Sequence, residues 1–136
     1  MRISTAKLVG LAVICLPVSA AGADMSYLVR AKIPVHCQVQ QRSPGGEAVD
    51  GNAVSLGSFR EYCNAPGGYQ LVVRYAPGSL QGAVLQAGED HVILNGSGEA
   101  ILSRASGPRF RERAITATPG RHGFDTDRLE FQLLPS

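Results

Sequence analysis

Histidine and cysteine are the residues of this chain best suited to bind a metal, and their spacing decides whether they could do so. Zinc sites combine them in short patterns such as C-x2–4-C or H-x3–5-H. Neither pattern occurs: His36 adjoins Cys37, Cys63 is distant, and on a strand His36 would point away from Cys37. We therefore expect no metal or other cofactor here, with His36 facing solvent.

A serine hydrolase site is not indicated either. The nucleophile motif G-x-S-x-G is missing from the chain. The nearest acid–imidazole pairs are Asp90–His91 and His122–Asp125, and such neighbours are common in loops. We expect a protein that is not an enzyme.

A group of arginines is the third set of residues with chemical potential. In SRASGPRFRER, Arg109, Arg111 and Arg113 would share one face of a strand, opposite Phe110 and Glu112. If that face points outward, the arginines could contact anionic glycans or membrane headgroups. A solvated face, or a sheet edge protected by charge against aggregation, is the more ordinary interpretation.

The first 23 residues have the pattern of a cleaved signal peptide. Arg2 and Lys7 precede an apolar run of eleven residues, 8–18, and small residues follow. The run is much shorter than the roughly 20 residues that a membrane-spanning helix needs. Cleavage after Ala20 or after Ala23 fits the small-residue rule. We expect export to the periplasm, the cell surface or the extracellular space, with no transmembrane segment left after cleavage.

Cleavage would leave one domain, 24–136, with two cysteines. It would remove two basic residues and no acid, so the formal charge would fall from +2 to 0. A neutral chain lacks the basic surface of a nucleic-acid-binding protein. An even cysteine count in an exported chain predicts a disulfide, here between Cys37 and Cys63.

Alternating apolar residues predict strands throughout this domain. In 27–39 every odd position is apolar, which favours a long strand with one buried face and a break near Pro34. A phase shift at Gly57–Ser58 predicts a bulge, and 64–68 predicts a hairpin turn before a strand that starts at Tyr69. Five further apolar runs alternate with turn signals: 83–85, 92–94, 100–102, 114–116 and 129–133. The pattern indicates an all-β protein, an immunoglobulin-like β-sandwich.

In their order, these features resemble the spore coat protein U family and the related archaic chaperone–usher pilins. The resemblance rests on the signal peptide, on VRAKIPVHCQV, on CNAPGGYQLVV and on the closing GFDTDRLEFQLLP. It covers nearly the whole of 24–136.

The resemblance implies a pilin-like adhesive or structural subunit whose sandwich lacks its final strand. A periplasmic chaperone, and then the N-terminal segment of a like subunit delivered by an usher, would supply that strand. The implied donor strand lies within 24–33, and its candidate residues are Tyr27, Val29, Ala31 and Ile33. The implied acceptor groove lies beside the last strand, at Leu129, Phe131 and Leu133. The short sequence before the first strand leaves a second possibility open, a monomeric periplasmic or cell-surface binding module.

Overall fold

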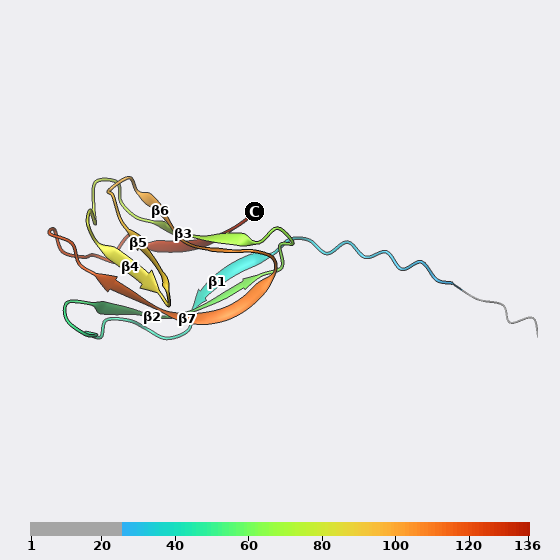
Figure 1. Ribbon diagram of the computed structural model, residues 1–136, viewed down its shortest axis with the longest axis horizontal. Coiled ribbons are helices and arrows are strands. Elements are labelled where there is room, and N and C mark those ends of the chain that lie inside the picture. Colours follow the sequence, from blue (N-terminus) through green and yellow to red (C-terminus); the bar gives the residue numbers. More distant parts are fainter. Residues whose placement is uncertain (1–25) are drawn as a thin grey trace, which may run out of the picture. The chain divides into compact units, whose positions relative to one another are not determined.

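The computed structural model describes residues 26–136, and their only regular secondary structure is β-strand (Figure 1). The predicted signal peptide lies outside the described residues. The chain divides after Lys32 into two units, and all the described strands belong to the second, Ile33–Ser136. In order they are β1 (Cys37–Gln41), β2 (Val54–Cys63), β3 (Tyr69–Arg74), β4 (Val84–Ala87), β5 (Asp90–Ile93), β6 (Glu99–Ala105), β7 (Arg109–Thr118) and β8 (Glu130–Pro135).

The strands form two antiparallel sheets that pack on each other as a β-sandwich. The larger sheet has the order β1-β2-β7-β4-β5, and the smaller one has the order β6-β3-β8. Both sheets contribute side chains to one core, among them Leu56, Phe59, Leu71, Leu85, Ile115 and Leu133. The expected all-β sandwich is confirmed.

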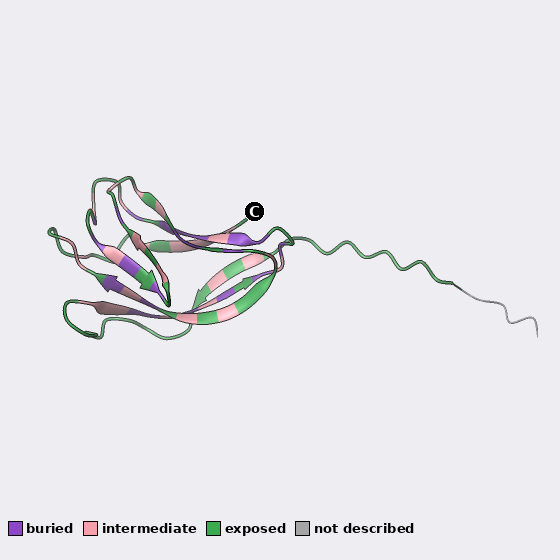
Figure 2. Ribbon diagram, viewed as in Figure 1, coloured by how far each residue is buried: buried purple, intermediate pink, exposed green. Residues whose placement is uncertain are grey.

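Alternation of apolar residues along a strand predicts its buried face correctly where the other sheet covers that face. Tyr69, Leu71 and Val73 alternate along β3, and all three are completely buried. In Figure 2, β1 and the first half of β7 instead alternate between exposed and half-buried residues. Packing is therefore less complete at β1 and in that half of β7 than at the centre of the smaller sheet.

The turn at 64–68 is not the hairpin that its sequence predicts. Cys63 ends β2 in the larger sheet, whereas Tyr69 begins β3 in the smaller one, so the turn carries the chain between the layers. Gly68 is required there: its φ is +96°, and an added Cβ would collide with the carbonyl oxygen of Ala105. Turn residues predict that the chain reverses direction, but they do not determine whether the two flanking strands pair with each other.

The predicted bulge in β2 is confirmed. The pairing of β2 with β7 shifts register between Ser55 and Gly57. Gly57 has a φ of +96°, a conformation that a residue with a Cβ rarely adopts. Its N–H donates a hydrogen bond of 3.1 Å to Oγ of Ser55 rather than joining the regular ladder.

The long first strand predicted for 27–39 is wrong in its extent. Only Cys37–Gln41 is a strand, and 26–36 is exposed without regular structure. Alternation gives a segment one apolar face, but a strand also needs a partner for its backbone groups. In the described chain β1 finds that partner in β2, from Cys37 opposite Cys63 to Gln41 opposite Phe59.

Candidate functional site

A groove opens where the two sheets leave their edges uncovered. β1 ends the larger sheet and β8 ends the smaller one, and these two strands lie close to each other. No other described strand pairs with the outer edge of either, so both edges retain backbone groups that could bind a further strand.

The groove is a cavity of about 730 Å³, and its lining combines apolar and polar residues. The larger sheet contributes Val39, Leu56 and Phe59 to it. Leu129 and Phe131 line the opposite side, and the centres of the Phe59 and Phe131 rings are 4.9 Å apart. Core side chains are therefore accessible from this side of the sandwich.

Two of the three predicted acceptor residues line this groove. Leu129 and Phe131 do so, whereas Leu133 is buried in the core beyond it. Sequence reasoning missed Phe124, which also lines the groove from the loop before β8. Its signal was the aromatic residue in GFDTD, a loop position without the alternation that marks a strand.

The predicted donor residues are exposed. Tyr27, Val29 and Ile33 have 81%, 85% and 76% of their surface accessible, and Ala31 is exposed as well. Large apolar side chains in an alternating row are unusual on a solvated segment, because their burial is worth about 1.5–3 kcal/mol each. The segment has the composition of a strand without being one.

The cysteine pair holds the groove's edge strand in place. Cys37 and Cys63 form a disulfide, as predicted, and they are directly opposite each other in the β1–β2 ladder. Cys63 is almost completely buried, and Cys37 packs against the core. The bond therefore ties the first residue of β1 to the last residue of β2.

The sequence suggests that Arg109, Arg111 and Arg113 form an outward, solvated face. That expectation is wrong for two of the three. Arg111 and Arg113 point between the sheets, where both bind the carboxylate of Glu61, which is completely buried. Only Arg109 is exposed. Both arginines reach Glu61 because β7 pairs with β2 in the register Glu61 opposite Arg111.

Glu61 accepts four hydrogen bonds in this cluster. Nε of Arg111 donates to Oε2 over 2.8 Å, and Nε and Nη2 of Arg113 donate to Oε1 over 2.9 and 2.6 Å. The fourth comes from the Tyr69 hydroxyl, over 2.8 Å to Oε2. Ser103 of β6 accepts from both arginines, and Asp90 accepts from Arg113. The cluster joins the two sheets through polar contacts.

The cluster makes the stability of the protein sensitive to alkaline pH. Burial, followed by the hydrogen bond and the negative charge of Glu61, raises the pKa of Tyr69 to about 12. An unfolded tyrosine has a pKa of about 10. The folded state therefore favours the neutral phenol, and this contribution is complete below pH 10 and is lost as the pH rises towards 12.

We expect Tyr69→Phe to lower the free energy of unfolding by roughly 1–3 kcal/mol at neutral pH, because it removes a hydrogen bond to a buried carboxylate. The difference from wild type should shrink between pH 10 and 12, the interval between the two pKa values. Urea unfolding at a series of pH values measures it. The half-exposed Tyr62 provides the control, Tyr62→Phe. A difference that stayed constant over this interval would contradict the assignment.

The histidines do not assemble a reactive site in the part of the chain that the structure describes. Asp90 binds Arg113 instead of His91, with 2.7 Å between Oδ2 and Nη1. Within 26–136 no group of three or more histidine, cysteine, aspartate or glutamate residues is placed to hold a metal ion. No helix long and apolar enough to cross a membrane occurs in that range.

Comparison with known proteins finds no match: no family model, no curated protein sequence and no solved structure is similar enough to this chain to be reported.

Proposed function

We propose that the protein is an exported, non-enzymatic, pilin-like subunit that assembles with copies of itself by donor-strand exchange. The observation that carries the proposal is the groove between the edges of β1 and β8, in which apolar side chains of both sheets are accessible. In the same chain, the exposed alternating segment 27–33 offers a strand to fill such a groove. A periplasmic chaperone and an usher are the partners that this mode of assembly requires, by resemblance to archaic pilins.

The segment and the groove match in length and chemistry. Seven residues in a strand span about 23 Å, slightly more than the roughly 20 Å of the six residues of β8. Tyr27, Val29, Ala31 and Ile33 would share the face that enters the groove, and Leu28, Arg30 and Lys32 would lie on the opposite face. Backbone hydrogen bonds to the open edges would contribute affinity, and the apolar residues would contribute specificity.

We expect the double substitution Val29→Asn with Ile33→Asn to abolish self-assembly. Losing two buried apolar side chains should weaken the association by on the order of 100-fold or more. Light scattering coupled to size-exclusion chromatography, over a range of protein concentrations, measures the change. The matched control is Arg30→Asn with Lys32→Asn, which changes the opposite face of the same segment.

Two results would count against the proposal. A wild-type protein that stays monomeric at every concentration without a chaperone would contradict strand exchange. Equal loss of assembly in both double variants would show that the alternation has no role.

The second candidate function, a monomeric binding module, has one observation in its favour. On the outer face of the larger sheet, Phe110 is 64% exposed, and the guanidinium carbon of Arg60 lies 5.5 Å from the centre of its ring. Tyr62 is opposite Phe110 in the ladder. Exposed aromatic rings beside a cation can bind a sugar or another planar ligand. The concentration series above separates the two functions.

A further inference from the structure

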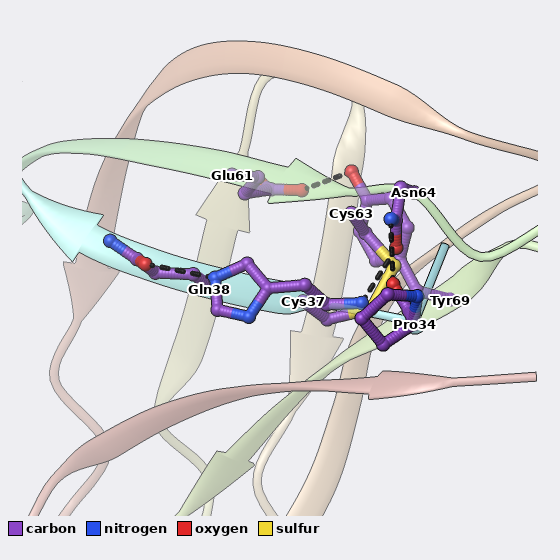
Figure 3. Close-up of a disulfide and its surroundings, with 8 residues drawn as sticks. Pro34, Cys37, Gln38, Glu61, Cys63, Asn64 and Tyr69 are labelled. Carbon is purple, nitrogen blue, oxygen red and sulfur yellow. Dashed lines mark hydrogen bonds between the residues drawn. A yellow bond between two sulfur atoms is a disulfide. The ribbon is translucent and has the colours of Figure 1, made fainter. Parts of the chain in front are cut away.

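Asn64, the first residue after β2, binds the backbone of the segment that leads into β1. Its Oδ1 accepts a hydrogen bond of 2.6 Å from the N–H of His36, and its Nδ2 donates one of 3.0 Å to the carbonyl oxygen of Pro34. Its own N–H donates to the carbonyl oxygen of His36 over 3.1 Å. Figure 3 shows Asn64 beside Pro34 and the disulfide. We call these three hydrogen bonds the Asn64 clamp.

The clamp extends the β1–β2 ladder beyond its last regular pair. That pair is Cys37 opposite Cys63, so His36 and Asn64 occupy the next positions. Asparagine suits the task because one side-chain amide carries both an acceptor and a donor. Residues 34–36 are thereby held along the line of β1 although they belong to no strand.

Without the clamp, the same residues could form the loop of a hairpin. A three-residue loop at 34–36 would place Ile33 opposite Cys37, Ala31 opposite Val39 and Val29 opposite Gln41. The apolar residues would then be in phase with Cys37 and Val39, which face the core. The chain would fill its own groove, in which Val39 and Gln41 are lining residues.

Such self-closure would outcompete assembly. A segment tethered by a short linker meets its target at an effective concentration on the order of 1 mM. A second copy present at about 1 µM would be disfavoured by roughly a thousandfold. A chain that assembles through this groove therefore needs a device against closing on itself.

We propose that the Asn64 clamp is this device: it keeps 34–36 extended, prevents the hairpin, and so reserves the groove for the N-terminal segment of a second copy of the chain. The inference rests on the proposed function, because it assumes that 27–33 is a strand donor.

The test compares the wild type with Asn64→Ala, both expressed with their own N-termini so that any processing takes place. Trypsin cleaves after Arg30 and Lys32, and insertion of the segment into a groove should protect both bonds. In wild type we expect protection to increase with protein concentration. In Asn64→Ala we expect protection at about 1 µM in a monomer, with cleavage at least tenfold slower than in wild type.

Two further variants separate the clamp from general effects on folding. Asn64→Asp keeps an acceptor for the N–H of His36 but removes the donor to Pro34, so it should be protected to an intermediate degree. Asn52→Ala, in the exposed turn between β1 and β2, should behave like wild type. Circular dichroism confirms that each variant is folded.

The outcomes distinguish the two proposals. Wild type that assembles, with an Asn64→Ala variant cleaved at the wild-type rate, would overturn the clamp and leave strand exchange intact. A synthetic peptide of residues 26–33 that fails to bind the wild-type protein, together with cleavage that is independent of concentration, would overturn strand exchange itself. Protection of Asn64→Ala as a monomer supports the clamp.

Discussion

Glu61→Gln is expected to lower the free energy of unfolding by about 3–5 kcal/mol, the usual cost of removing one partner from a buried ion pair. The carboxylate of Glu61 is completely buried and is the shared acceptor for Arg111, Arg113 and Tyr69. A neutral amide cannot balance two guanidinium groups, and its NH2 group would be directed at donors. The loss is the cost of leaving Arg111 without a charged partner and Arg113 with Asp90 alone.

Denaturant unfolding of Glu61→Gln beside Glu112→Gln measures this effect. Glu112 pairs with Arg60 over 3.4 Å at the surface, where an ion pair contributes about 0–1 kcal/mol. Replacing Glu61, Arg111 and Arg113 together by leucine should destabilise the protein less than Glu61→Gln does, because the one charge that loses its partner, Asp90, is partly exposed to solvent. If Glu61→Gln and Glu112→Gln had equal effects, the cluster would contribute no more than a surface pair.

The paired substitution Cys37→Ser with Cys63→Ser is expected to cost about 3–4 kcal/mol, because the disulfide closes a loop across a sequence separation of 26 residues. Beside this loss of global stability we expect the largest local loss of order in β1, an edge strand whose one described strand partner is β2. Since β1 also forms one side of the groove, we expect self-assembly to decrease with stability.

Hydrogen exchange with and without a reducing agent locates that loss. In the reduced wild type, the amides of β1 should exchange much faster than those of β3, which lies in the middle of the smaller sheet. Tyr69→Phe provides a comparison, because it lowers global stability without releasing β1. Uniform acceleration in all strands after reduction would contradict a local role for the disulfide.

Several features of the fold could be predicted from the sequence because they depend on local pattern. Tyr69, Leu71 and Val73 recur at every second position, and the strand and its buried face follow from that period, although Val72 between them is buried as well. Gly57 disturbs the phase and marks the bulge. The cysteine pairing follows from an even count in a chain with a predicted signal peptide, and the structure confirms it.

The groove and its neighbours could be predicted only in part. Residues 27–35 have the same alternation as β3, yet the described structure gives them no strand, because a strand exists only where another strand accepts its hydrogen bonds. Phe124 lines the groove from a loop, and loops have no alternating pattern from which its position could be predicted. The alternation shows that a segment could form a strand, and the presence of a pairing strand determines whether it does.

The three arginines of β7 show most clearly which features follow from the sequence and which depend on the tertiary structure. The sequence by itself determined that Arg109, Arg111 and Arg113 alternate with Phe110 and Glu112, and that the chain is a disulfide-linked β protein. Only the tertiary structure decided that Arg111 and Arg113 turn inward. The anion that they share, Glu61, is 50 and 52 residues away in the chain and reaches them through the β2–β7 register. Burial of a charge depends on its partner, and sequence spacing does not reveal a partner so distant.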